Sequence, residues 1–153
     1  FSLAFDKAGI GTIAFAMNQH EGIAFACDYH CYAEKPDEGF FGYKQSNPAV
    51  RKLLLNFFLA YKGELTFHNA AYDLKAIICA LWMKDLLDTP MMLQGLDLMT
   101  TRFHDTKVIA YLATNSTAGN VLGLKSLAHE FAGNWAKEDI KDIRRIPLPE
   151  LLT

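Results

Sequence analysis

The sequence predicts a mixed α/β domain, in which an antiparallel hairpin and parallel strands form a sheet flanked by helices. Two segments, 11–17 and 23–27, alternate large and small apolar residues with the two-residue period of strands. Four later segments place apolar residues at helical spacing. Strand-like segments lie between those helices, and strands separated by helices pair in parallel.

Length and composition predict one domain over residues 1–153. The 153 residues are 51% hydrophobic with a formal net charge of −2, which is too apolar and too weakly charged for a disordered chain. The charge also excludes a basic protein that coats nucleic acid by neutralising phosphates. It allows a metal-dependent nuclease, whose site is built from carboxylates. No apolar run approaches the 18 residues of a membrane span, so we expect no membrane partner.

The cysteines indicate a reducing compartment. There are three, an odd and low number that argues against a secreted disulfide scaffold and favours the cytoplasm. Zinc is an alternative use for Cys27 and Cys31 with His20 and His30. Their spacing fits no standard zinc finger, so we favour reduced thiols and surface histidines.

The first third of the chain predicts a hairpin followed by a loop. Residues 18–22 supply turn chemistry between the two alternating segments, 11–17 and 23–27. Residues 28–46 contain Pro and Gly and show no clear period, which predicts a long loop.

The first helix is predicted by its start signal and its apolar stripe. Asn47 is a good N-cap residue and Pro48 suits the first helical position. Gly63 is expected to end this helix, and residues 64–67 read as a short strand. The core-facing stripe consists of Val50, Leu53, Leu54, Phe57, Phe58 and Tyr61.

The remaining elements follow from the same signals. A helix is predicted from about Ala71 to Met83, and a strand over 99–104. Asp105 can cap a further helix, and a last helix over 124–131 is expected to close at Gly133.

The junction at residues 67–75 holds the main candidate site. There a strand ends and a helix begins, which is where ligands bind in open α/β sheets. Asp73 lies in the first helical turn, rotated away from the buried stripe that starts at Leu74, and Asn69 lies one turn earlier. An Asp in a first turn and an Asn before a helix are also ordinary helix-start residues.

The surrounding residues resemble the DnaQ-like 3′–5′ exonucleases, which include the proofreading domains of family-A DNA polymerases, here of phage type. Residues 68–74, His-Asn-Ala-Ala-Tyr-Asp-Leu, are similar to the second motif of that family. Residues 103–106 resemble its strand-to-helix Asp-Thr, residues 122–128 its Leu-x-x-Leu-Ala helix, and residues 146–152 the approach to its last helix.

The resemblance implies a ribonuclease-H-like sheet and hydrolysis assisted by two divalent ions, Mg²⁺ or Mn²⁺. It implies that Asp73 is a catalytic metal ligand. Asn69, Tyr72 and His68 match positions that bind substrate or support the site. For Asp105 and Thr106 a helix cap is the favoured role, with support of the metal site as the alternative.

The resemblance also implies that both ends of the domain lie outside this polypeptide. The family's Asp-x-Glu strand is expected before Phe1, so the first strand is truncated, and its Tyr-x-x-x-Asp motif is expected after Thr153. With one of four expected carboxylates present, this fragment is itself expected to be inactive on DNA.

The sequence thus predicts the 3′–5′ exonuclease domain of a DNA polymerase in a bacterial or phage-infected cytoplasm. Its expected partners are the 3′ end of single-stranded DNA and the polymerase domain of the same chain. One alternative is a stand-alone exonuclease of the same fold that trims RNA or DNA. Another is a catalytically inert domain that binds nucleic acid or serves as a scaffold.

Overall fold

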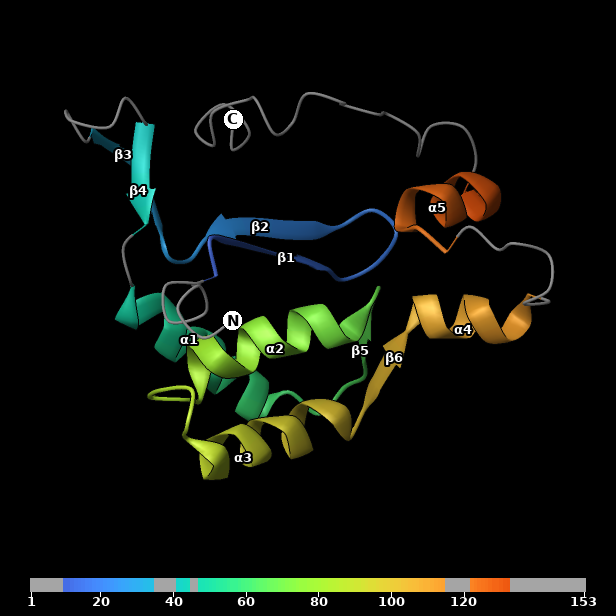
Figure 1. Cartoon of the computed structure of the whole chain (residues 1–153). Helices are drawn as coiled ribbons and strands as arrows, with labels where there is room; N and C mark the ends of the chain where they lie inside the picture. The colour runs from blue at the N-terminus through green and yellow to red at the C-terminus, as the bar shows by residue number, and fades with distance from the viewer. Residues whose placement is uncertain (1–9, 35–40, 45–46, 115–121, 133–153) are drawn as a thin grey trace.

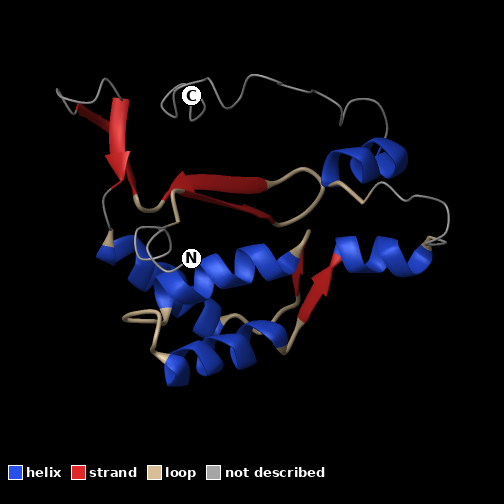
Figure 2. Cartoon of the chain, in the orientation of Figure 1, coloured by secondary structure: helices blue, strands red, loops and turns tan. Residues whose placement is uncertain are grey.

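The computed structural model describes residues 10–34, 41–44, 47–114 and 122–132 (Figure 1). Their strands form three two-stranded sheets, two antiparallel and one parallel, with helices around them (Figure 2). The predicted mixed α/β class is therefore confirmed, whereas the predicted single sheet is not formed by the described strands. Within these residues no helix is long and apolar enough to cross a membrane.

The predicted first hairpin is confirmed. Strand β1 (Thr12–Ala16) pairs antiparallel with β2 (Gly22–Ala26), with Thr12 opposite Ala26. Asn18 closes the turn, because its Oδ1 accepts the backbone N–H groups of His20 at 2.8 Å and Glu21 at 3.0 Å. This side-chain turn is typical of Asn at the start of a reversal.

The predicted loop over residues 28–46 is wrong for two stretches. Strands β3 (Tyr29–Glu34) and β4 (Phe41–Lys44) pair antiparallel there. Their register shifts between His30 and Glu34, and such a bulge interrupts the two-residue alternation by which a strand is recognised in a sequence.

Helix α1 (Pro48–Ala60) begins as predicted. The Asn47 side chain accepts the backbone N–H of Val50 at 3.3 Å, and Leu54 and Phe58 are buried. The helix ends at Ala60, before the predicted terminator Gly63, because Tyr61 has an extended backbone conformation and already forms the C-cap.

Two parallel strands carry the helices of the candidate site. Strand β5 (Leu65–Phe67) precedes α2 (Ala70–Leu81), and β6 (Phe103–Asp105) precedes α4 (Thr106–Ala113). The two strands pair in parallel, with Phe67 opposite Asp105, so both helices start at the same end of this sheet.

Helix α3 (Thr89–Thr100) was not predicted, and the strand predicted over 99–104 is wrong for its first residues. Asp88 caps α3 by accepting the backbone N–H of Met91. Met99 lies on the helix and is 2% exposed, because it packs into the core. Helix α5 spans Leu124–Ala132, and its predicted end at Gly133 lies outside the described residues.

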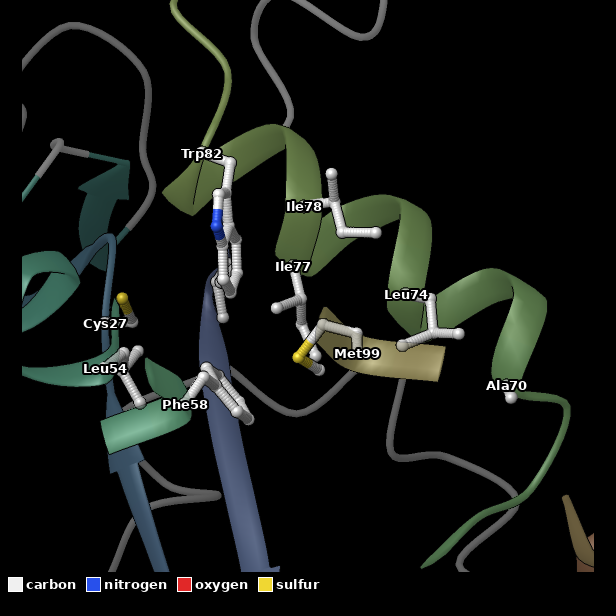
Figure 3. Close-up of a cluster of buried hydrophobic side chains, with 10 residues drawn as sticks. Cys27, Leu54, Phe58, Ala70, Leu74, Ile77, Ile78, Trp82 and Met99 are labelled. Carbon is white, nitrogen blue, oxygen red and sulfur yellow. The ribbon is translucent and has the colours of Figure 1, made fainter. Parts of the chain in front are cut away.

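The hydrophobic core lies between α1, α2 and α3 (Figure 3). The rings of Phe58 and Trp82 lie 6.3 Å apart and link α1 to the C-cap of α2. The buried members of this core are Ile10, Cys27, Leu54, Phe58, Ala70, Leu74, Ile77, Ile78, Trp82 and Met99.

One buried ion pair joins the bend after β2 to α1. The carboxylate of Asp28 is fully buried and accepts hydrogen bonds from Nε and Nη2 of Arg51, at 2.8 and 2.6 Å. It also accepts hydrogen bonds from the backbone N–H groups of Ile10 and Asn47. Burial opposes this charge, but these bonds outweigh it and lower the pKa of Asp28. Arg51 also donates to the backbone oxygen of Ala80, so α2 joins the same network.

Candidate functional site

The candidate site lies at the carboxyl ends of β5 and β6, where α2 and α4 begin side by side (Figure 1). The chain turns sharply between β5 and α2 at Asn69, which has φ of 67° and ψ of 52°. Asn tolerates this left-handed conformation better than most residues. Its side chain makes no capping hydrogen bond to α2, so the role of ordinary helix cap considered for Asn69 is wrong.

Asp105 instead caps both helices. Its Oδ1 accepts the backbone N–H of Asn69 and of Lys107, each at 2.9 Å, and its Oδ2 accepts the backbone N–H of Ala70 at 2.8 Å. A carboxylate at a helix N-terminus satisfies otherwise unpaired N–H groups and interacts favourably with the helix dipole. Asp105 therefore fixes the start of α2 relative to the start of α4.

The charge of Asp105 is stabilised by these contacts. Partial burial favours the neutral acid, but four backbone N–H groups outweigh it and lower the pKa of Asp105 below its ordinary value. The donors belong to Asn69, Ala70, Lys107 and Val108. Asp105 thus stays ionised in the folded protein at neutral pH, with its oxygens directed at the backbone.

Thr106 ties the end of β5 to the start of α4. Its hydroxyl donates to the backbone oxygen of Phe67 at 3.0 Å and lies 3.0 Å from Nδ1 of His68. Since the single hydroxyl proton is used toward Phe67, His68 must donate from Nδ1.

Asp73 occupies a different environment from Asp105. It is half-buried and lines a groove of about 520 Å³ between α2 and β1. None of the described residues forms a hydrogen bond or ion pair with its carboxylate. Burial, and then the negative charge of Asp105, raise the pKa of Asp73 above its ordinary value.

Two further residues of the predicted site lie nearby. Tyr72 lines the same groove as Asp73, and its side chain is 74% exposed. Asn69 directs its Oδ1 toward Nζ of Lys107, at 3.2 Å. Lys107 was missed by sequence reasoning, because its contact with Asn69 joins residues that are 38 positions apart in the chain.

The structure therefore separates the predicted site residues into two groups. Asp73 and Tyr72 line the groove beside β1, whereas His68, Asn69, Asp105 and Thr106 form the hydrogen-bonded junction between β5 and β6. Among the described residues no three carboxylate, histidine or cysteine side chains cluster closely enough to hold a metal ion. Comparisons of this chain with protein-family models, curated proteins and solved structures give no match.

Proposed function

We propose that this chain is a DnaQ-like 3′–5′ exonuclease domain with a ribonuclease-H-like sheet, which acts on the 3′-terminal phosphodiester of single-stranded DNA beside a polymerase domain. The observation that carries the proposal is the state of Asp73. This carboxylate is half-buried, lines a groove beside the parallel strands, and has no hydrogen-bond partner among the described residues. A charged group in that state is stabilised by a cation.

The chemistry of Asp73 fits a hard divalent ion. Mg²⁺ and Mn²⁺ prefer carboxylate oxygens, and Mg²⁺ is bound through one or two carboxylates with the phosphate of the substrate. A bound divalent ion of this kind would polarise the phosphodiester and lower the pKa of a nucleophilic water. The described part of the chain supplies one such ligand, Asp73, and the others are expected in family motifs that lie outside it.

The other residues of the site would bind the substrate or keep Asp73 in position. The exposed ring of Tyr72 beside Asp73 suits stacking on an unpaired 3′-terminal base, which is a sequence-tolerant contact. Lys107 places a positive charge next to Asn69 for a backbone phosphate. Asp105 holds the start of α2, and so the first-turn position of Asp73, through its bond to Ala70.

Metal binding by Asp73 can be tested without enzymatic activity. We expect millimolar Mn²⁺ to broaden the amide NMR signals of Asp73 and its neighbours, because a paramagnetic ion relaxes nearby nuclei. Asp73→Asn is expected to remove this broadening. The matched control is Asp97→Asn, which alters an exposed carboxylate on α3 away from the groove. Broadening that survives in Asp73→Asn, or that is removed equally by Asp97→Asn, would contradict the proposal.

Substrate binding provides a separate test. We expect a labelled single-stranded oligonucleotide to bind more tightly with Mn²⁺ than with EDTA, and Tyr72→Ala to weaken binding by about tenfold, the loss of one stacked base. The matched control is Tyr111→Ala, since Tyr111 is a half-exposed tyrosine on α4. An equal effect of both substitutions, or no effect of Mn²⁺, would argue against the assignment.

A further inference from the structure

Asn69 and Lys107 belong to the starts of two different helices, and a single carboxylate oxygen holds both of their backbones. Oδ1 of Asp105 accepts the backbone N–H of Asn69 and the backbone N–H of Lys107, each at 2.9 Å. Asn69 precedes α2, and Lys107 lies in the first turn of α4. The two side chains therefore start from fixed positions, and they meet across the junction, where Nζ of Lys107 lies 3.2 Å from Oδ1 of Asn69.

This contact determines which end of the Asn69 amide faces Lys107. A lysine ammonium has three donors and no acceptor, so only the oxygen of an amide can face it. The NH₂ group of Asn69 must then point away from Lys107. Asn69 is exposed, and within the described part of the chain no group accepts a hydrogen bond from this NH₂ group. Its donors are therefore available to a molecule bound at the junction.

The stability of α4 does not explain a lysine at position 107. Cations are favourable near the C-terminus of a helix and unfavourable near its N-terminus, where Lys107 lies. The oxygens of Asp105 are directed at backbone N–H groups, and the one hydrogen bond of the Lys107 ammonium to a described residue is the one to Asn69. Its contact with the Asn69 amide is thus the interaction that accounts for the position of this ammonium.

We propose that Lys107 is a positioning residue, which holds the Asn69 amide so that its NH₂ group donates to an acceptor oxygen of bound DNA. This inference rests on the proposed function, which places a single strand at this junction. The phosphate oxygens of a strand accept hydrogen bonds and cannot donate them. A fixed donor suits such oxygens, whereas an amide that rotates freely would present its own oxygen as well. Lys107 acts through Asn69 in this way, in addition to any effect of its charge.

The orientation of the amide is tested in the free protein, without DNA or metal. We expect the side-chain carbonyl carbon NMR signal of Asn69 to shift in Lys107→Met, because the carbonyl loses its donor. Lys107→Arg restores a donor and is expected to return the signal toward its original position. The matched control is Lys75→Met, since Lys75 is an exposed lysine on α2. An Asn69 signal that does not move in Lys107→Met, or that moves equally in Lys75→Met, would overturn the proposal.

The role in binding is tested by a double-mutant cycle with a labelled single-stranded oligonucleotide and Mn²⁺. Asn69→Gly removes the amide and keeps the left-handed backbone, which glycine adopts freely. We expect the loss of affinity caused by Lys107→Met to be about fivefold larger in the unaltered chain than in Asn69→Gly. An equal loss in both backgrounds would overturn the proposal and leave the proposed function standing, because Lys107 would then act by its charge alone. If the unaltered chain does not bind the oligonucleotide, the proposed function fails and this role of Lys107 fails with it.

Discussion

Asp105 gives the sharpest test of how the two helices of the site are held. In Asp105→Asn, one oxygen remains as an acceptor for the N–H groups of Asn69 and Lys107, but the acceptor for Ala70 is replaced by an NH₂ donor. Hydrogen bonds to charged groups contribute about 1.5–3 kcal/mol each to stability. The bond from Ala70 to Asp105 is partly exposed to water, which places its contribution at the low end of this range. We expect a loss of about 2 kcal/mol at pH 7.

The assay is urea denaturation followed by circular dichroism. With a slope of about 2 kcal/mol/M, a loss of this size lowers the urea midpoint by about 1 M. Asp97→Asn is the control and is expected to change the free energy of unfolding by less than about 0.5 kcal/mol, since Asp97 is exposed on α3.

The pH dependence of Asp105→Asn supplies a second readout. The folded-state pKa of Asp105 is lowered, so its stabilising contribution is complete above the unfolded-state pKa of about 3.9. That contribution is lost as the pH falls through the folded-state pKa. The difference in unfolding free energy between wild type and Asp105→Asn should therefore narrow as the pH falls below about 4. An equal loss in Asp97→Asn at pH 7, or a difference independent of pH, would refute the reasoning.

Three further predictions concern the ion pair, the buried thiol and the groove carboxylate. Arg51→Met leaves the fully buried Asp28 without its charge partner, so we expect a loss of about 3–5 kcal/mol in urea denaturation; a loss below 1 kcal/mol would contradict the network. Burial, followed by the charge of Asp28, raises the pKa of the Cys27 thiol to about 11. Iodoacetamide at pH 8 should therefore alkylate Cys27 at least 100-fold more slowly in the folded than in the urea-unfolded protein. Equal alkylation rates would contradict the burial of this thiol. The pKa of Asp73 is raised, so the folded protein becomes less stable as the pH rises from the unfolded-state pKa through the folded-state pKa. Asp73→Asn should therefore stabilise the protein at pH 7 and have no such effect at pH 2. A variant that is destabilised at pH 7 would show that the carboxylate has a structural partner.

Local signals predicted the elements that carry the site. Asn47 and Pro48 mark the start of α1, and the apolar spacing after Ala70 marks α2. By contrast, the capping of both α2 and α4 by Asp105 depends on tertiary structure. Asp105 caps the helix after β5 from 35 residues away, which spacing along the chain does not reveal.

The missed elements also have physical reasons. Helix α3 contains Pro90 and Gly95, two residue types that are unfavourable in helix interiors, so its sequence does not indicate a helix. In the structure Pro90 lies in the first turn, where proline is tolerated, and Gly95 allows α3 to approach Ile78 and Trp82 closely. A Cβ at Gly95 would lie 3.0 Å from Ile78 and 3.1 Å from the Trp82 ring. Such packing requirements are visible only once two helices are placed together.

The carboxyl pKa of Asp73, measured by carbon NMR titration with and without Mg²⁺, tests the central claim most directly. The carboxyl group of Asp73 should titrate above its ordinary pKa in EDTA and at a lower pH in about 20 mM MgCl₂, with the exposed Asp97 as the control. A pKa of Asp73 that is already low in EDTA, or that moves no more than that of Asp97 on adding Mg²⁺, would contradict its assignment as a metal ligand.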